Sequence, residues 1–330
     1  MTGVAERLRQ EGCTSASRET FPVSAAWFDA WDAAYGAGRA LAIGGVRLAD
    51  TRAWLGPLPY RLRRSRTNPH TAVFDGDPAG VTAAALLGGA DVVRLDYLPE
   101  GSALLAAARG WPGARIAPHA LAPVVDCRAP YPDWLMRRSK RIRQRWPKQD
   151  RHVFDTLGLR YARVAAVDDL PMLLAEMLAL ERAGWKGREG TAIADSAADT
   201  RFYTGLATRA MAAGALRLAL LRDGERLVAF EYAILGGDIA YVLKVAYDEA
   251  YEDASIGHVL AARHIRDCCD DPAIAWYDQL GNGMTPAPYK LRFADAVHTR
   301  WRVTLYGRGI GQLVRAHDLA RARVKAWRQP

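Results

Sequence analysis

Two charged side chains, Glu231 and Lys244, stand out within the apolar strands of a hairpin sequence, "LVAFEYAILGGDIAYVLKVAY", at residues 227–247, where a third charge, Asp238, follows the two glycines. A two-residue turn at Gly236 and Gly237 sets the expected register, because loop length determines how hairpin strands pair. In that register Glu231 and Lys244 share one sheet face with alanines, while bulky residues fill the other face. A carboxylate beside an ammonium group in such a place is a candidate for proton transfer. The alternative is a solvent-facing sheet surface with an ordinary ion pair.

The segment after the hairpin, "DEAYEDASIGHVLAARHI", joins a small-residue loop to a helix that starts near Ser255. The first N–H groups of a helix have no intrahelical acceptor, so this position suits a phosphate, with Ser255 and Gly257 allowing close approach. The alternative is that Ser255 only caps the helix.

Other familiar catalytic patterns are absent from the sequence: GxSxG, HExxH, GxxxxGK[ST], and a GxGxxG that opens a helix after a strand. His258 and His264 are six residues apart and cannot both point at one metal from a regular helix face. We therefore expect no metal, and a site that binds and orients its substrates.

The net charge of +9 comes from two segments, 137–151 and 298–330, each with eight Lys or Arg and one Asp. Trp134 and Trp146 beside the first segment raise the possibility of a nucleic-acid surface. We favour a solvated helix face whose Trp134, Ile142 and Trp146 dock inward, and we expect no DNA partner. Attraction of an anionic cofactor or substrate is a third interpretation.

The 330 residues favour two domains, 1–150 and 151–330. The first half mixes helices and strands and ends with a basic helix over 132–146 that Pro147 stops. The second half predicts helices over 169–183, 197–213 and 255–269, strands over 160–165, 215–222, 226–235, 239–247, 274–280 and 298–306, and a last helix over 309–327. This order is typical of an α+β fold.

The cysteines, at positions 13, 127, 268 and 269, lack metal-ligand spacing, and we interpret them as reduced thiols. The N-terminus has no apolar core of a signal peptide, and the sequence has no run of 18 apolar residues. We therefore expect a cytoplasmic protein.

Several motifs, in this order and with these gaps, resemble one family: "WKGREGTAI", "AFEYAI", "YVLKVAYDEAYEDASIG", "YDQLG" and "PYK". The family is the CelD-type group of GNAT-fold N-acyltransferases, named after cellulose-biosynthesis proteins and distantly similar to the Fem aminoacyltransferases. The resemblance extends over nearly the whole chain. It implies tandem GNAT-like domains, each a mixed, mostly antiparallel sheet flanked by helices. The N-terminal domain would be degenerate, and the C-terminal domain would bind acyl-CoA as co-substrate.

In that fold the pyrophosphate of CoA lies on backbone amides between the fourth strand and the next helix. The matching residues are Asp253, Ala254, Ser255, Ile256, Gly257 and His258. The chain departs from the general pattern of Gln or Arg, two residues, Gly, any residue, and Gly or Ala. Only Ser255 and Gly257 keep the small character, and relatives carry Pro where Ile256 stands and Trp where Phe293 stands.

The resemblance also implies roles for individual side chains. Trp185 would form an apolar wall of the substrate cleft, and Lys186 or Arg188 would meet a phosphate or carboxylate. Glu231 or Asp278 would take the amine proton, Tyr289 would protonate the leaving thiolate, and Lys290 or Lys244 would orient an acidic substrate group. The structural alternatives are a core position for Trp185, an Arg188–Glu189 pair, a hinge role for Tyr289 and a capping role for Asp278.

The resemblance thus implies an acyl-CoA-dependent N-acyltransferase that modifies an amine of a small molecule, sugar or peptide. The alternatives are transfer from aminoacyl-tRNA, as in the Fem enzymes, and a non-catalytic accessory protein of an envelope-polysaccharide system. The last helix, 309–327, could make a weak contact with a membrane surface through its apolar stripe and cationic border. We favour packing of that stripe, which includes Leu313, Val314 and Trp327, onto the protein itself.

Overall fold

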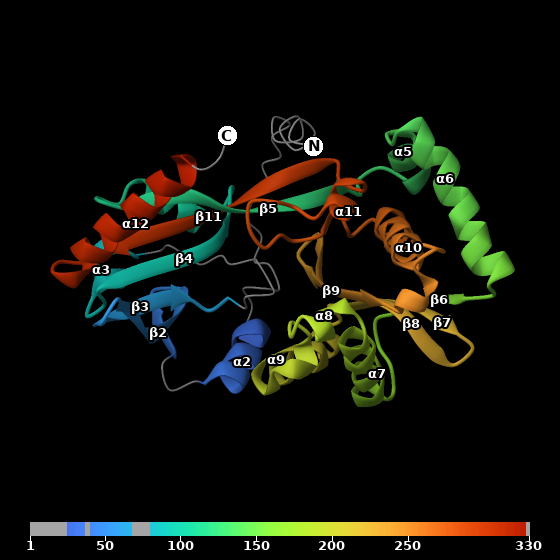
Figure 1. Cartoon of the computed structure of the whole chain (residues 1–330), viewed down its shortest axis with the longest axis horizontal. Helices are drawn as coiled ribbons and strands as arrows, with labels where there is room; N and C mark the ends of the chain where they lie inside the picture. Colours follow the sequence, from blue (N-terminus) through green and yellow to red (C-terminus); the bar gives the residue numbers. More distant parts are fainter. Residues whose placement is uncertain (1–24, 37–39, 68–79, 328–330) are drawn as a thin grey trace.

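The computed structural model describes residues 25–36, 40–67 and 80–327. These residues form one sheet of eleven strands in the order β1-β2-β3-β4-β11-β5-β10-β9-β8-β7-β6. Only the pairs β3–β4 and β9–β10 are parallel, and the others are antiparallel. Helices flank the sheet (Figure 1), so the predicted α+β class with a mixed, mostly antiparallel sheet is confirmed.

The N-terminal half begins with a helix and a meander of three strands. Its elements are α2 (Ala25–Tyr35), β1 (Ala40–Ile43), β2 (Val46–Leu55), β3 (Leu58–Ser65), α3 (Ala83–Leu87), β4 (Val92–Pro99), α4 (Ala103–Arg109) and β5 (Arg115–Asp126). The sequence "HTAVFDG" at 70–76 also predicts a strand, but these residues lie outside the described ones, as does Cys13. Strand β3 was not predicted.

The rest of the chain begins with three helical segments and ends in a long helix. Its elements are α5 (Tyr131–Met136), α6 (Lys140–Arg151), η3 (His152–Thr156), β6 (Arg160–Val164), α7 (Leu170–Ala183), α8 (Trp185–Arg188), η4 (Ile193–Asp195), α9 (Ala197–Ala212), β7 (Leu216–Asp223), β8 (Arg226–Gly236), β9 (Ile239–Tyr247), η5 (Glu249–Tyr251), α10 (Ile256–Asp270), β10 (Trp276–Asp278), α11 (Pro288–Leu291), β11 (Ala296–Tyr306) and α12 (Ile310–Trp327). Strand β11 returns to lie between β4 and β5. The division into two domains near residue 150 stays a prediction.

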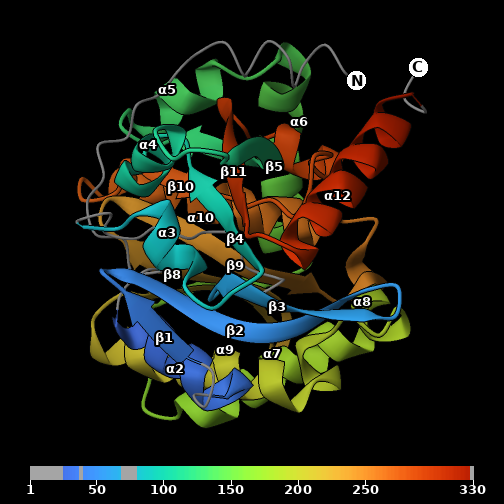
Figure 2. The same cartoon turned by 90° about the vertical axis from the view of Figure 1, so that its left-hand side faces the viewer.

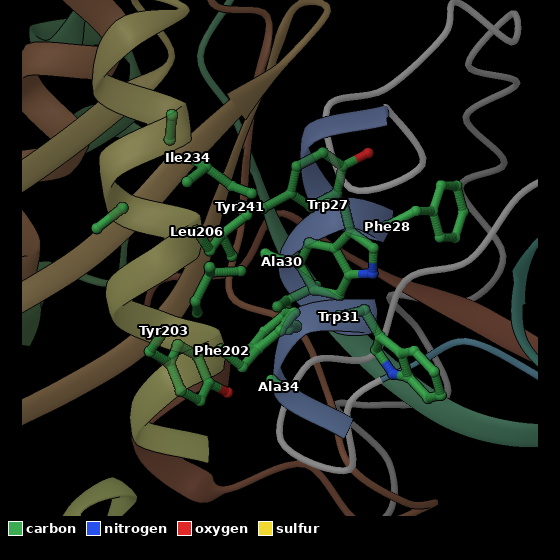
Figure 3. Close-up of a cluster of buried hydrophobic side chains, with 14 of the residues drawn as sticks. Trp27, Phe28, Ala30, Trp31, Ala34, Phe202, Tyr203, Leu206, Ile234 and Tyr241 are labelled. Atoms are coloured by element: carbon green, nitrogen blue, oxygen red, sulfur yellow. The ribbon is translucent and has the colours of Figure 1, made fainter. Parts of the chain in front are cut away.

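Helices α7 and α9 cover one face of strands β7 to β9, and α10 covers the other (Figure 1). Helix α2 crosses from the N-terminal half to pack on α9, as Figure 3 shows. Trp27 of α2 is 1% exposed and meets Phe202 of α9 edge to face, with ring centroids 4.9 Å apart. Burial of two such aromatic side chains stabilises this contact by several kcal/mol, on the order of 1.5–3 kcal/mol each.

Residues 131–151 form two helices, α5 and α6, and not the single helix predicted over 132–146. Pro147 lies inside α6 and does not end it. A proline in a helix interior is unfavourable by about 3 kcal/mol, but its neighbour Trp146 anchors this turn by stacking on Phe293 at 4.9 Å and on Trp134 at 5.6 Å. Trp134 and Trp146 are buried and Ile142 packs against the same cluster, so their predicted inward docking is confirmed.

The predicted register of the β8–β9 hairpin is wrong. Gly236 pairs with Ile239, which makes Gly237 and Asp238 the turn. The ladder also shifts between Tyr232 and Ala233, because β9 carries one extra residue there. Such a bulge reverses which face the later side chains occupy.

The bulge separates two residues that the sequence placed together. Lys244 pairs with Tyr232, whereas Glu231 pairs with Val245. Because Glu231 and Tyr232 are neighbours in one strand, they point to opposite faces, so Lys244 lies on the α7–α9 face and Glu231 on the α10 face. The alanine face is also not open, since Ala233 and Ala240 are fully buried in a cluster with residues of α10.

Helix α12 extends away from the body of the molecule (Figure 2). Val314 is buried and Ile310 packs against the same small cluster, but Leu313 is 54% and Trp327 87% exposed. The prediction that the apolar stripe packs onto the protein therefore holds only for the first turns of the helix. Within the described residues, no helix is long and apolar enough to cross a membrane.

Candidate active site

The candidate site lies where two neighbouring strands diverge. Strands β9 and β10 pair over three residues only, ending at Tyr241 and Asp278. The chain then follows β5: Gln279 N–H donates to the Pro123 carbonyl at 3.1 Å, and an added Cβ on Gly281 would lie 1.8 Å from the Leu121 carbonyl oxygen. The edge of β9 over residues 242–247 is therefore left without a neighbouring strand among the described residues.

The first turn of α10 follows this open edge. Ser255 adopts a left-handed conformation with φ of 56° and its side chain makes no capping hydrogen bond. The N–H groups of Ile256 and Gly257 have no hydrogen-bond partner in the described parts of the chain, whereas His258 N–H donates to the Ser255 carbonyl at 2.9 Å. An added Cβ on Gly257 would lie 3.2 Å from the ring of Tyr247, so the turn and the strand edge are in contact.

Glu231 belongs to a buried hydrogen-bonded group on the α10 face. Its Oε2 accepts from the Tyr277 hydroxyl at 2.8 Å and lies 2.8 Å from Nδ1 of His264. All three residues are at most 4% exposed. Oε1 of Glu231 has no partner among the residues that the structure describes, so this oxygen can still accept a proton.

Tyr289 and Lys290 of α11 lie near this group. Burial, followed by the negative charge of Glu231, raises the pKa of Tyr289 to about 12, which keeps its hydroxyl protonated. The Tyr289 side chain is 40% exposed and so is reachable from solvent. Lys290 Nζ donates to the carbonyls of Gln279 at 2.5 Å and Leu280 at 3.1 Å. Burial lowers the pKa of Lys290 to about 8, and the nearby charge of Lys186 acts in the same direction.

A second charged group lies on the α7–α9 face. Lys186 Nζ is 2.8 Å from Oε1 of the buried Glu181, and it also donates to the Val245 carbonyl on the open edge of β9 at 2.7 Å. Lys244 Nζ is 3.9 Å from the same Glu181 oxygen and 5.0 Å from the Tyr203 ring centroid. Burial lowers the pKa of Lys244 to about 8, against the attraction of Glu181.

The loop at α8 closes over the strand edge. Trp185 N–H donates to Oε1 of Glu249 at 2.8 Å, and the Arg188 guanidinium pairs with the same carboxylate at 2.8 Å. Arg188 therefore does not pair with Glu189. Trp185 is 47% exposed and is not a core residue. The loop lies between α7 and α9, as the sequence predicts, and Glu249 ties it to the segment that leads into α10.

Asp278 is held in a different environment from Glu231. It forms an ion pair with Arg300, and its Oδ1 accepts from Leu280 N–H at 2.7 Å. Tyr277, the preceding residue of β10, points toward α10, so Asp278 points to the opposite face. The site thus brings together Glu231, Tyr289 and Lys290 but not Asp278, whose catalytic role stays a prediction.

Three site residues were missed by the sequence reasoning: Glu181, His264 and Tyr277. Glu181 and His264 are polar residues on the buried faces of amphipathic helices, which is a usable signal because burial of such groups requires partners. Tyr277 lies inside the quoted motif "YDQLG". In the described parts of the chain, no group of three His, Cys, Asp or Glu side chains is arranged to hold a metal ion.

Comparison with known proteins supports the fold. FemX superposes with a TM-score of 0.57 at 10% identity, over 83% of this chain and 90% of that one. The C-terminal domain of a protein from Agrobacterium fabrum, provisionally named lysylphosphatidylglycerol synthetase, gives 0.56 at 12% identity, over 95% and 93%. L-PGS from Bacillus licheniformis gives 0.51 at 12% identity, over 89% and 95%. At these identities the similarity shows a shared fold.

The sequence comparison is more specific for one segment of the chain. No curated protein matches the chain significantly. Residues 137–291, which contain the open edge of β9, the first turn of α10 and Tyr289, match the model of the acetyltransferase (GNAT) domain. Residues 137–291 therefore match a GNAT acetyltransferase domain, which supports an enzyme of the N-acyltransferase type, and the chain shares its fold with FemX.

Proposed function

We propose that the protein transfers an acyl group from acyl-CoA to an amine of a small molecule, sugar or peptide. The observation that carries the proposal is the open edge of β9 that leads to two unpartnered N–H groups, those of Ile256 and Gly257. A strand edge offers amide hydrogen bonds to an extended chain such as pantetheine, and free N–H groups at a helix start bind pyrophosphate. The donor would thus lie along β9 with its thioester near the divergence from β10.

Tyr289 is the proton donor for the leaving thiolate in this proposal. Its pKa of about 12 keeps it protonated at neutral pH, and its partial exposure leaves the hydroxyl reachable. A positioned acid of this kind contributes about 10²–10⁴ to the rate. Direct transfer then needs no covalent intermediate with the protein.

Glu231 is the proton acceptor for the amine, directly or through water. His264 and Tyr277 hold its Oε2 and leave Oε1 without a partner among the described side chains. We prefer Glu231 to Asp278, because Asp278 is paired with Arg300. Lys186 and Lys244 would bind an acidic group of the acceptor, as they share a single buried carboxylate, Glu181.

Calorimetry with CoA and acetyl-CoA tests the donor proposal. We expect Gly257→Glu to abolish binding, because a carboxylate would stand beside the free N–H groups. Gly110→Glu is the matched control, since an added Cβ there makes only an ordinary contact of 3.5 Å far from the site. Gly257→Ala, which adds no charge, should weaken binding less. Unchanged CoA affinity in folded Gly257→Glu would contradict the assignment.

Aminoacyl-tRNA is the second candidate donor. The shared fold with FemX permits it, and the solvent-facing cations of α6 favour an RNA ligand. Binding through phosphate contacts weakens steeply with salt. If tRNA binds with a strong dependence on salt and CoA does not bind, aminoacyl-tRNA replaces acyl-CoA as the proposed donor.

A further inference from the structure

A small cationic cavity lies between α6 and the first turn of α10. Its volume is about 230 Å³, and its polar lining includes Arg141, Arg145, Gln149, His258 and Arg292. This volume is below the roughly 300–1,000 Å³ of pockets that enclose a whole small molecule. The cavity therefore suits one charged group of a larger ligand.

The three arginines of this cavity have no carboxylate partner among the described residues. The lining of the cavity includes no Asp or Glu. Arg141 and Arg145 are four residues apart on one helix, an arrangement that repels by a few tenths of a kcal/mol. Arg292 and Arg145 also contribute, after burial, to lowering the pKa of His258. The positive charge in this cavity is thus uncompensated.

The neighbouring cavity differs in charge and makes an internal comparison. Its volume is about 180 Å³, and it shares Trp146 and His258 with the first. Its two arginines are paired, Arg263 with Asp150 at 2.5 Å and Arg266 with Asp270 at 3.6 Å. The two neighbouring cavities therefore differ in charge, because the arginines of one are paired with carboxylates and those of the other, within the described residues, are not.

We propose that the cavity of Arg141, Arg145 and Arg292 binds a phosphomonoester, and that this group is the 3′-phosphate of CoA. The proposal rests on the proposed acyl-CoA donor. His258 belongs both to the first turn of α10 and to the cavity wall, so a pyrophosphate on the N–H groups of Ile256 and Gly257 would lie next to it. CoA carries a pyrophosphate and, on the ribose, a separate phosphomonoester. Guanidinium groups recognise phosphate oxygens through charge-assisted hydrogen bonds.

Calorimetry with CoA and 3′-dephospho-CoA tests this inference. We expect the intact protein to bind CoA at least about tenfold more tightly than dephospho-CoA, a change that one or two charge-assisted hydrogen bonds supply. In Arg145→Gln and Arg292→Gln we expect CoA affinity to fall to the level of dephospho-CoA, while dephospho-CoA affinity stays the same. Arg143→Gln is the matched control, because Arg143 is on the same helix and does not line the cavity.

Each result has a distinct meaning. Equal affinities for CoA and dephospho-CoA in the intact protein would overturn the inference and leave the acyl-CoA donor in place. Absence of binding by both ligands would overturn the donor proposal and the inference together. If the two variants lost salt-dependent binding of tRNA and kept their CoA affinity, the cavity would be a site for an RNA phosphate, which also overturns the inference.

Discussion

Replacement of Glu231 by leucine should destabilise the protein strongly, because two buried polar groups would lose their partner. The Tyr277 hydroxyl and Nδ1 of His264 both lie 2.8 Å from Glu231 Oε2, and both residues are 1% exposed. A buried polar group without a partner costs about 1–3 kcal/mol. The free energy of unfolding should therefore fall by about 2–6 kcal/mol in Glu231→Leu.

A double-mutant cycle separates the hydrogen bond from the packing. Tyr277→Phe alone removes one bond to a charged acceptor and should cost about 1.5–3 kcal/mol. In the Glu231→Leu background the same change removes an unsatisfied hydroxyl and should be neutral or stabilising. Urea unfolding of the four proteins measures a coupling energy, which we expect to exceed about 1 kcal/mol. Additivity within about 0.5 kcal/mol would refute the hydrogen-bonded group as described.

Glu231→Gln tests catalysis with a smaller structural change. A glutamine can keep both bonds at the Oε2 position but cannot accept a proton at neutral pH. We therefore expect a modest loss of stability and a fall in turnover of about 10²–10⁴, measured as thiol release once an acceptor is identified. Full turnover in this variant would exclude Glu231 as the base.

Three further results are expected. Tyr289→Phe should lower kcat by about 10²–10⁴ and leave donor affinity unchanged, and a kcat within threefold of the intact enzyme would contradict its role as the acid. Because the pKa of Lys244 falls from 10.5 to about 8 on folding, the unfolded state binds more protons between these values and stability rises with pH there. Between pH 7.5 and 10.5 the free energy of unfolding should therefore rise by up to about 3 kcal/mol less in Lys244→Met than in the intact protein, as urea unfolding measures. The same rise in both proteins would refute this expectation. Deletion of residues 312–330 should destabilise the fold, because Val314 is buried and Asp318 pairs with Arg94. A folded, active protein that no longer sediments with anionic vesicles would instead support the membrane contact.

Local periodicity was sufficient to predict most elements of the C-terminal half. The predicted helices over 169–183 and 255–269 match α7 and α10 within one residue, and the strand over 239–247 matches β9. These elements have clear apolar patterns and distinct ends, so each can be recognised without knowledge of its neighbours.

The hairpin register could not be predicted, because the turn and the bulge depend on contacts from outside the hairpin. Lys244 reaches Glu181 of α7 only when the bulge turns it to that face. Glu231 reaches His264 of α10 only on the other face. The sequence of the two strands contains neither partner, so counting outward from Gly236 and Gly237 gave the wrong faces.

Long-range pairings account for the other differences. Strand β11 joins β4 and β5, which lie more than 150 residues earlier in the chain, and Arg300 of β11 thereby reaches Asp278. A local pattern cannot show that Asp278 has a dedicated cation. The stacking of Trp146 on Phe293 likewise explains a proline in a helix interior that local rules exclude.

The contact between Lys186 and the Val245 carbonyl bears on how a donor would enter. A pantetheine chain on the open edge of β9 would compete for this carbonyl, so binding would require Lys186 to release it. The release would cost about 1.5–3 kcal/mol, the worth of one hydrogen bond from a charged donor, while Lys186 keeps its ion pair with the buried Glu181 at 2.8 Å. Arg188 and Trp185 meanwhile tie the same loop to Glu249, just before α10. A donor bound at the strand edge and at the first turn of α10 would therefore affect the α8 loop. Because Trp185 of this loop is the expected wall of the substrate cleft, donor binding would be coupled to the acceptor site.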